Sequence, residues 1–412
     1  PSWTVTNGGT LEMNNVSGAS NSQRIGDSAP IALGGGTLTL VSATTAESVG
    51  QVSLLAGAST ISTSGTAPSL TIASLGSRAA GATLNFTGSG IAISQAENVN
   101  GILAGWATYN SSNFACINNG TMAAYAAYYT GSLASAAGTD NAKPSAAQSG
   151  LDSLTVNTLL LGGSGVTVTM NAEATLTIAA GGVLMTNSTS AIHGGSITSG
   201  TEDLTVFSTA ASTISSAIVG DIALTKSGGA RLTISSPANA WTGPTYVNAN
   251  TLACGAAGVI PSTSAVVVAT GATLDLGGFD QSIGSIAGGG AVSLGLGNLT
   301  VGGDNTSTTL TGAISGSGNV TKIGEGVWTL TGSSSFKGTM NIVQGTVSVA
   351  SVNDHAANTP LGCATLTTAT ITLGGPATEG TLRYTGGDGA SNRPLAVGGA
   401  GGGIVEITRA DT

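Results

Sequence analysis

The chain has 412 residues, of which 41% are hydrophobic, 65 are glycine and only 7% are charged, and its formal net charge is −9. Disordered chains combine low hydrophobicity with high net charge, so this composition predicts a folded protein with an uncharged Ser/Thr/Asn surface. Nucleic-acid binding requires clustered Lys and Arg, and the ten basic residues form no cluster, which excludes nucleic acid as a partner. No apolar run approaches the roughly 18–20 residues that span a bilayer, so we expect no direct membrane insertion.

A short pattern of one apolar, one polar and one apolar residue recurs along the chain. It occurs as Leu11-Glu12-Met13, Leu38-Thr39-Leu40, Leu84-Asn85-Phe86, Leu176-Thr177-Ile178, Leu232-Thr233-Ile234, Leu274-Asp275-Leu276, Trp328-Thr329-Leu330 and Leu382-Arg383-Tyr384. Such alternation is typical of a half-buried strand, in which the middle residue faces water and its neighbours face a core. Recurrence from residue 11 to residue 384 predicts one continuous all-β architecture.

Residues 96–150 interrupt this pattern. The segment contains six of the fifteen aromatic residues: Trp106, Tyr109, Phe114, Tyr125, Tyr128 and Tyr129. Met122, Tyr125, Ala126 and Tyr129 have helical spacing, although Gly120 and Gly131 limit a helix to about two turns. We expect the six aromatics to cluster outside the strand stack, either as a lateral contact surface for sugars or proteins or as a local core that seals its side.

The most regular part of the chain is Leu310–Val349, in which four to five short alternating runs are separated by Gly or Gly/Ser turns. A degenerate copy lies upstream, as three alignments show. Leu224-Thr225-Lys226 matches Val320-Thr321-Lys322, Trp241-Thr242-Gly243 matches Phe336-Lys337-Gly338, and Asn250 stands where Gly345 stands. Asn and Gly are the residues that most readily adopt a left-handed backbone, so the last exchange preserves a turn.

This pattern resembles the autotransporter-associated β-strand repeat of large bacterial surface proteins. The core of the resemblance is GSGNVTKIGEGVWTLTGSSSFKGTMNIVQGTVSV, preceded by the Gly-rich segment from Gly271 to Ile314. It covers residues 150–412 well and the first 150 residues more loosely. The resemblance implies a secreted β-solenoid and no particular chemistry, because these proteins share a fold and not a reaction.

Two all-β architectures fit the alternation. A β-sandwich requires hairpin turns and a broad core, whereas the inward residues here are mostly Leu, Val, Ile and Ala, which suits a narrow core. A parallel β-helix also protects its strand edges, since each turn covers the next. We therefore expect a single-stranded right-handed parallel β-helix over 1–95 and 151–412, with an aromatic-rich loop excursion at 96–150.

Catalytic, cofactor and metal sites are not expected. Glu202 and Asp203 are adjacent and would point to opposite faces of a strand, Asp354-His355 lies in a loop, and His193 lies between Gly-rich turns. Stacking of turns could place Asp275, Asp280 and Asp304 on one face, which is the arrangement that a β-helix polysaccharide lyase or hydrolase would need. Cys116, Cys254 and Cys363 are expected to be small buried hydrophobes, with one long-range disulfide as the alternative.

The sequence thus favours a non-enzymatic extracellular structural protein, a rigid rod of a bacterial surface fibre or matrix. The alternatives are an autotransporter-like adhesin that binds glycans or other cells and, more remotely, a polysaccharide-cleaving β-helix enzyme. Thr10–Met13 and Ile404–Ile407 look like ordinary strands and not like caps. We therefore expect copies to join end to end through their terminal turns, or the solenoid to continue in a longer chain.

Overall fold

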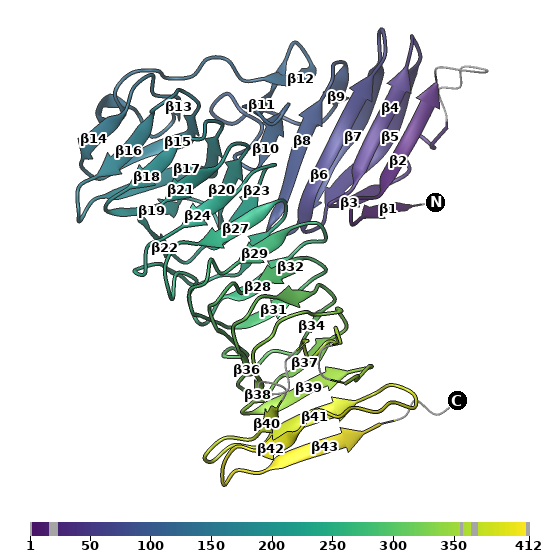
Figure 1. The fold of residues 1–412 in the computed structure, drawn as a ribbon. Helices are drawn as coiled ribbons and strands as arrows, with labels where there is room; N and C mark the ends of the chain where they lie inside the picture. The colour runs from purple at the N-terminus through teal and green to yellow at the C-terminus, as the bar shows by residue number, and fades with distance from the viewer. Residues whose placement is uncertain (1, 16–23, 355–356, 364–369, 409–412) are drawn as a thin grey trace. The chain divides into compact units, whose positions relative to one another are not determined.

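A computed structural model describes residues 2–15, 24–354, 357–363 and 370–408 of the chain (Figure 1). The fold is a right-handed parallel β-helix of about 17 turns, which confirms the predicted fold class. The helical structure among the described residues is one short 3₁₀ turn, η1 (Leu133–Ser135). In the part of the chain that the structure covers, no helix is long and apolar enough to cross a bilayer.

The described residues form two compact units. Unit 1 comprises Pro1–Leu232 with Asn248–Asn250, and unit 2 comprises Thr233–Val247 with Thr251–Thr412. Unit 1 itself contains two stacks of coils, here called the first stack (strands β1–β10) and the second stack (strands β13–β24).

The first stack is built on two sheets of parallel strands. One sheet consists of β1 (Trp3–Thr6), β3 (Ile31–Gly34), β5 (Ala46–Leu54), β7 (Ser69–Arg78) and β9 (Ile91–Ile93). The other consists of β2 (Thr10–Asn15), β4 (Thr37–Ser42), β6 (Gly57–Ser64), β8 (Ala82–Thr87) and β10 (Ala107–Tyr109), extended by β11 (Asn113–Asn118) and β12 (Thr121–Ala124). The register places like residues above one another, for example Leu38 beside Ile61, so the apolar core is continuous along the stack.

The second stack also has two sheets of parallel strands. Within unit 1, one sheet contains β13 (Asn141–Ala142), β15 (Leu154–Leu161), β17 (Thr175–Met185), β19 (Ser196–Ser199), β20 (Asp203–Ser208), β22 (Ala217–Gly220) and β23 (Ala223–Ser227). The other contains β14 (Gln148–Leu151), β16 (Thr167–Met170), β18 (Ala191–His193), β21 (Ser212–Ile214) and β24 (Leu232–Ile234), the last of which crosses the boundary between the units. Both sheets contain further strands, which are described below with unit 2. The long strand β17 pairs with β19 through its first half and with β20 through its second half.

Unit 2 repeats this construction with shorter strands. Its strands are β25 (Ala240–Trp241), β26 (Thr245–Val247), β27 (Thr251–Cys254), β28 (Ala265–Val268), β29 (Thr273–Asp275), β30 (Gln281–Ile283), β31 (Ser285–Ala287), β32 (Ala291–Ser293), β33 (Leu299–Val301), β34 (Thr308–Leu310), β35 (Ile314–Ser315), β36 (Val320–Lys322), β37 (Val327–Leu330), β38 (Met340–Ile342), β39 (Gly345–Val349), β40 (Ile371–Leu373), β41 (Gly380–Tyr384), β42 (Leu395–Val397) and β43 (Gly403–Ile407). Two of its sheets run β30-β33-β36-β38-β40-β42 and β34-β37-β39-β41-β43. All their pairings are parallel, and Val320, for example, lies beside Met340 of the next coil.

The burial of the recurring pattern agrees with the prediction. Leu274 and Leu276 are fully buried, whereas Asp275 between them is half-buried on the outer face. The same alternation holds in β4, β8, β24 and β37. Leu11 and Tyr384 are only half-buried, although the pattern predicts both inside.

The helical spacing in the excursion does not produce a helix, because residues 121–124 form strand β12. Strand β10 continues the β8 sheet in parallel, and β11 and β12 extend it with antiparallel pairings. The sheets of the first stack end at the excursion, and β13 and β14, which follow it, belong to the two sheets of the second stack. Asn119 and Gly120 both have positive φ, of 47° and 78°, and they form the two-residue turn between β11 and β12 that an Asn-Gly pair favours.

Two lysines occupy matching positions of the internal repeat and are buried. Lys226 in unit 1 is 0% exposed, and its Nζ donates to the carbonyl oxygens of Gly228 (2.9 Å) and Ala249 (2.5 Å). Lys322 in unit 2 is 1% exposed, and its Nζ donates to three carbonyl oxygens, including that of Gln344 in the next coil. Each ammonium therefore ties the turn that follows its own strand to the turn of the succeeding coil.

The burial of these two lysines predicts that the free energy of unfolding depends on pH. Burial lowers the pKa of Lys226 to about 7 and that of Lys322 to about 8, the latter against the attraction of Asp304. An unfolded lysine keeps its proton to about pH 10, so above pH 7–8 the unfolded chain binds more protons than the folded one, and stability rises with pH. We expect the urea midpoint to rise between pH 7 and pH 9, and to rise less in Lys226→Met. An equal rise in both proteins would contradict this assignment.

Candidate functional site

Five of the six aromatic residues of the excursion pack against the apolar cores of unit 1. Phe114 is fully buried in a cluster with Ile102, Leu160, Leu184 and Phe207, and these last three come from the second stack. Glycines allow the close approach: a Cβ on Gly105 would lie 2.0 Å from the carbonyl oxygen of Ala180, and one on Gly182 would lie 2.4 Å from that of Gly105. The excursion thus rests directly on the backbone of β17.

The remaining aromatics are half-buried. Tyr125 and Tyr128 meet edge to face with ring centroids 4.9 Å apart, and Phe114 donates its backbone N–H to the Tyr128 hydroxyl (3.0 Å). Burial raises the pKa of Tyr128 well above its usual range. Trp106 and Tyr109 pack against the core of the first stack, and the hydroxyl of Tyr129 donates to the Ser132 carbonyl oxygen. The excursion aromatics mainly fill the space between the two stacks, and their role in binding a partner stays a prediction.

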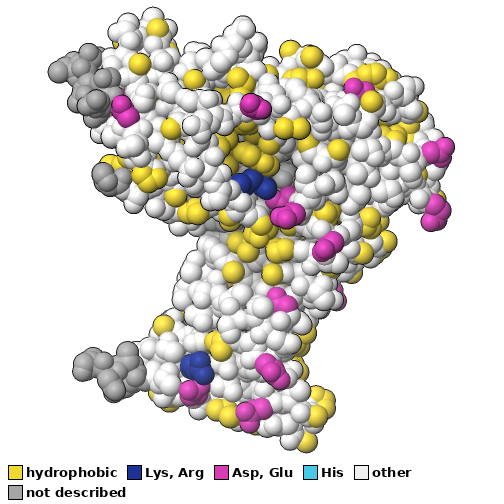
Figure 2. Space-filling model, turned by 180° about the vertical axis from the view of Figure 1, so that it is seen from behind, with side chains coloured by type: hydrophobic (Ala, Val, Ile, Leu, Met, Phe, Trp, Pro, Cys, Tyr) yellow, Lys and Arg dark blue, Asp and Glu magenta, His cyan; other side chains and the backbone are white. Residues whose placement is uncertain are grey.

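A groove of about 510 Å³ opens beside these aromatics, within unit 1. The apolar members of its lining are here called the apolar wall, and the charged and amide members the polar wall. The lining consists of Arg78, Val99, Asn100, Leu103, Ala104, Gly105, Trp106, Asn157, Ala179, Ala180, Thr201, Glu202, Asp203 and Thr205. Figure 2 shows a hollow of this composition, in which basic and acidic side chains meet below hydrophobic ones.

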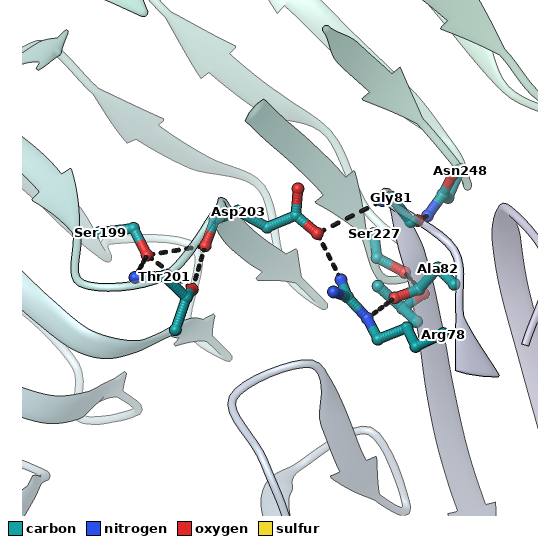
Figure 3. A network of polar contacts seen from close by, with 9 residues as sticks. Arg78, Gly81, Ala82, Ser199, Thr201, Asp203, Ser227 and Asn248 are labelled. Atoms are coloured by element: carbon teal, nitrogen blue, oxygen red, sulfur yellow. Dashed lines mark hydrogen bonds and ion pairs between the residues drawn. The ribbon is translucent and has the colours of Figure 1, made fainter. Parts of the chain in front are cut away.

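An ion pair forms the floor of the groove and joins the two stacks (Figure 3). Arg78, at the end of β7, donates through Nη2 to Oδ2 of Asp203 at 2.5 Å and through Nε to the carbonyl oxygen of Ala82 at 2.9 Å. The Arg78 guanidinium lies 5.5 Å from the centroid of the Trp106 ring, so the ring and the carboxylate hold it from two sides. The backbone N–H of Gly81 also donates to Oδ2 of Asp203 (3.3 Å).

Asp203 is 4% exposed, and its second carboxylate oxygen, Oδ1, accepts no hydrogen bond from any described residue. Figure 3 shows this oxygen turned away from both Arg78 and Gly81. The adjacent Glu202 is exposed and, like Asp203, belongs to the lining of the groove. Two carboxylates and one guanidinium leave one negative charge in excess.

Three asparagines near the groove form hydrogen bonds with one another. The Asn100 side-chain amide donates to Oδ1 of Asn157 (3.0 Å), that of Asn157 donates to Oδ1 of Asn141 (2.8 Å), and that of Asn141 donates to the Asn100 carbonyl oxygen (2.7 Å). This closed ring of hydrogen bonds ties the start of the excursion to β13 and β15. Further links join the stacks nearby, between Thr83 and Ser227 (2.9 Å) and from Asn248 to the Gly81 carbonyl (2.6 Å).

The sequence did not reveal this groove. Arg78 and Asp203 are 125 residues apart, and neither belongs to a motif. One indirect indication was present in the sequence. The chain has only ten basic residues, and a carboxylate that the fold buries needs a partner, so such a carboxylate is expected to pair with one of these few residues.

The other polar residues considered in the sequence hold turns. Asp280 accepts from the backbone N–H of Asn298 (2.7 Å) and Asp304 from that of Thr306 (2.9 Å), while Asp275 accepts from Gly277 (3.0 Å). His193 lies 2.7 Å from the Ser215 hydroxyl, and Asp354 accepts from Asn392 (2.8 Å). His355 lies outside the described residues.

Neither a metal cluster nor a disulfide is seen in the part of the chain covered by the structure. No group of three or more His, Cys, Asp or Glu side chains among the described residues could hold a metal ion. Cys116 and Cys254 are buried, Cys363 is half-buried, and none of the three is joined to another described cysteine by a disulfide. Burial raises the pKa of the Cys116 thiol.

The internal repeat matches a known protein-family model. The family model described as passenger-associated-transport-repeat matches residues 224–253 and 320–349. In the structure, Asn250 and Gly345 at its turn both have positive φ (53° and 71°), and the aligned Trp241 and Phe336 are both buried.

A curated relative extends the comparison beyond the repeats. The chain is 34% identical to the "Adhesin BmaC autotransporter" of Brucella suis biovar 1 (strain 1330) over 264 residues, which are 61% of this chain and 8% of that adhesin. No solved structure shows a significant match. The chain is therefore a β-solenoid protein that carries the autotransporter-associated β-strand repeats its sequence resembles.

Proposed function

We propose that the chain is part of the passenger region of an autotransporter adhesin, displayed outside the bacterial cell, and that it acts by binding and not by catalysis. The observation that carries the proposal is the pair of passenger-associated-transport repeats built into the coils of the solenoid. The similarity to a much longer protein named as an adhesin supports it, although the matched part is only 8% of that protein. A solenoid suits this role, because its stacked coils offer an extended lateral surface.

The polar groups of the described coils also suit a binding role. The carboxylates of Asp280 and Asp304 accept backbone N–H groups of turns, so they stabilise the coil and are not arranged as an acid–base pair. The groove in unit 1, by contrast, combines an apolar wall with charged side chains, which is typical of a surface that recognises a partner.

An attachment assay tests this function. Purified chain is coupled to fluorescent beads, and bead attachment to cultured epithelial cells is counted against beads that carry serum albumin. The proposal expects several-fold more attachment for the folded chain. Equal attachment of both bead types to every cell type tested would contradict it.

A second proposal concerns self-association through unit 2. Strands β42 and β43 each have a paired neighbour on one side within the sheet order of the described residues, and they expose apolar side chains. The exposed fractions are 50% for Leu395, 63% for Val397, 41% for Ile404, 49% for Val405 and 70% for Ile407. An apolar sheet edge of this kind favours the addition of a further strand pair, and we propose that a second copy supplies it when the 412-residue chain is purified on its own.

Light scattering of the purified chain tests this second proposal. Mass should rise with protein concentration, and Val405→Lys should suppress the rise because it places a charge on the free edge. Thr381→Lys, on the outer face of the paired strand β41, is the matched control and should leave association unchanged. A monodisperse monomer at high concentration would contradict end-to-end assembly.

A further inference from the structure

We propose that the groove of unit 1 is a binding site for a neutral saccharide. This inference rests on the proposed adhesin function and adds to it a site and a ligand class. The volume of about 510 Å³ lies within the range of small-ligand sites, and the lining comes from three separate segments: the end of β7, the excursion and strands of the second stack. Ligand sites commonly lie where two packed bodies meet. Here both stacks contribute residues to the lining.

The polar wall offers both acceptors and donors. Oδ1 of Asp203 is buried without a partner among the described residues, and burying a carboxylate oxygen in this way is costly unless something donates to it. Arg78 has five N–H donors, and its described bonds to Asp203 and Ala82 use two of them. Adjacent hydroxyl groups of a sugar can donate to the carboxylate and accept from the guanidinium at the same time.

The apolar wall suits the C–H face of a sugar ring. It is formed by Leu103, Ala104, Ala179 and Ala180, which are half-buried members of the lining. The Arg78 guanidinium lies over the ring of Trp106, 5.5 Å from its centroid, so this aromatic residue helps to position the donor.

The charge of the groove selects among ligands. Glu202 at the rim and Asp203 at the floor outnumber Arg78, so a sialylated, sulfated or phosphorylated glycan would meet net repulsion. A cationic ligand would meet the Arg78 guanidinium, which already occupies Oδ2 of Asp203. A neutral, hydroxyl-rich molecule uses both the donors and the acceptors.

The test is binding of the purified chain to an array of neutral and anionic oligosaccharides, followed by calorimetric titration with the strongest neutral binder. Glu202→Ala should weaken the affinity at least fivefold, because it removes a rim acceptor from an exposed position. Ala179→Phe should abolish binding, because its ring fills the groove. The matched controls are Glu173→Ala and Ala172→Phe, which alter exposed residues of the same stack outside the lining and should bind like the parent chain. Circular dichroism confirms that each variant is folded.

Binding of anionic glycans alone, binding of no neutral glycan, or neutral binding that survives both groove variants would overturn the inference. The attachment assay separates this failure from failure of the proposed function. Cell attachment that is insensitive to Ala179→Phe would leave the adhesin function standing without this site. Saccharide binding without any cell attachment would support this site and contradict the proposed adhesin function.

Discussion

Leu276→Asp is expected to unfold the coils of unit 2 around β29. Leu276 is 0% exposed, and its backbone N–H donates to the Ser293 carbonyl oxygen of the next coil (2.8 Å). A carboxylate at this position lies in the apolar core without a partner, which costs several kcal/mol, comparable to the whole stability of a typical domain. Because each coil rests on its neighbours, the loss should spread to adjacent coils.

The neighbouring residue provides the control for this prediction. Asp275 is half-buried on the outer face and accepts from the Gly277 N–H (3.0 Å), a bond that an asparagine side chain also makes. Asp275→Asn should therefore change the free energy of unfolding by less than about 1 kcal/mol. Thermal unfolding followed by circular dichroism compares the two variants. A Leu276→Asp variant that is folded and has an unchanged thermal unfolding midpoint would show that Leu276 does not lie in the apolar core.

Arg78→Met is expected to destabilise unit 1 by about 3 kcal/mol, because it leaves the buried Asp203 carboxylate with only the Gly81 N–H. The double variant Arg78→Met/Asp203→Leu should recover much of this loss, since a buried pair replaced by apolar residues is often neutral. The double-mutant cycle, measured by urea unfolding, should give a clearly favourable coupling between the two residues.

The ion pair between Arg383 and Glu406 is the matched control. Its distance is similar, at 2.7 Å, but its side chains are 33% and 36% exposed, so Arg383→Met should cost less than about 1 kcal/mol. Equal effects of Arg78→Met and Arg383→Met would mean that the Arg78–Asp203 pair does not hold the two stacks together.

The local pattern predicted the coils well, because alternation of polar and apolar residues is a property of each strand alone. Leu274, Asp275 and Leu276 lie where the pattern puts them. The alignment of the two repeats also identified positions with a shared backbone geometry, since Asn250 and Gly345 both adopt positive φ.

The excursion was predicted less well. The helical spacing from Met122 to Tyr129 arises by chance in a hairpin, and the Asn119-Gly120 turn, visible in the sequence, was the better signal. Contacts between the stacks could not be predicted, because they join residues more than a hundred positions apart and depend on how complete coils pack. The groove depends on these contacts between the two stacks, so it could not be predicted either.

Disulfide formation between engineered cysteines tests the parallel stacking of coils most directly. In β37 and β39, Val327 lies beside Thr346 and Thr329 beside Ser348, with Trp328 and Val347 facing the core between them. In a chain whose native cysteines are replaced by alanine, the pairs Val327→Cys/Thr346→Cys and Thr329→Cys/Ser348→Cys should both oxidise rapidly. The crossed pairs Val327→Cys/Ser348→Cys and Thr329→Cys/Thr346→Cys should remain reduced. Rapid oxidation of the crossed pairs instead would show that the strands run antiparallel and would contradict the β-solenoid.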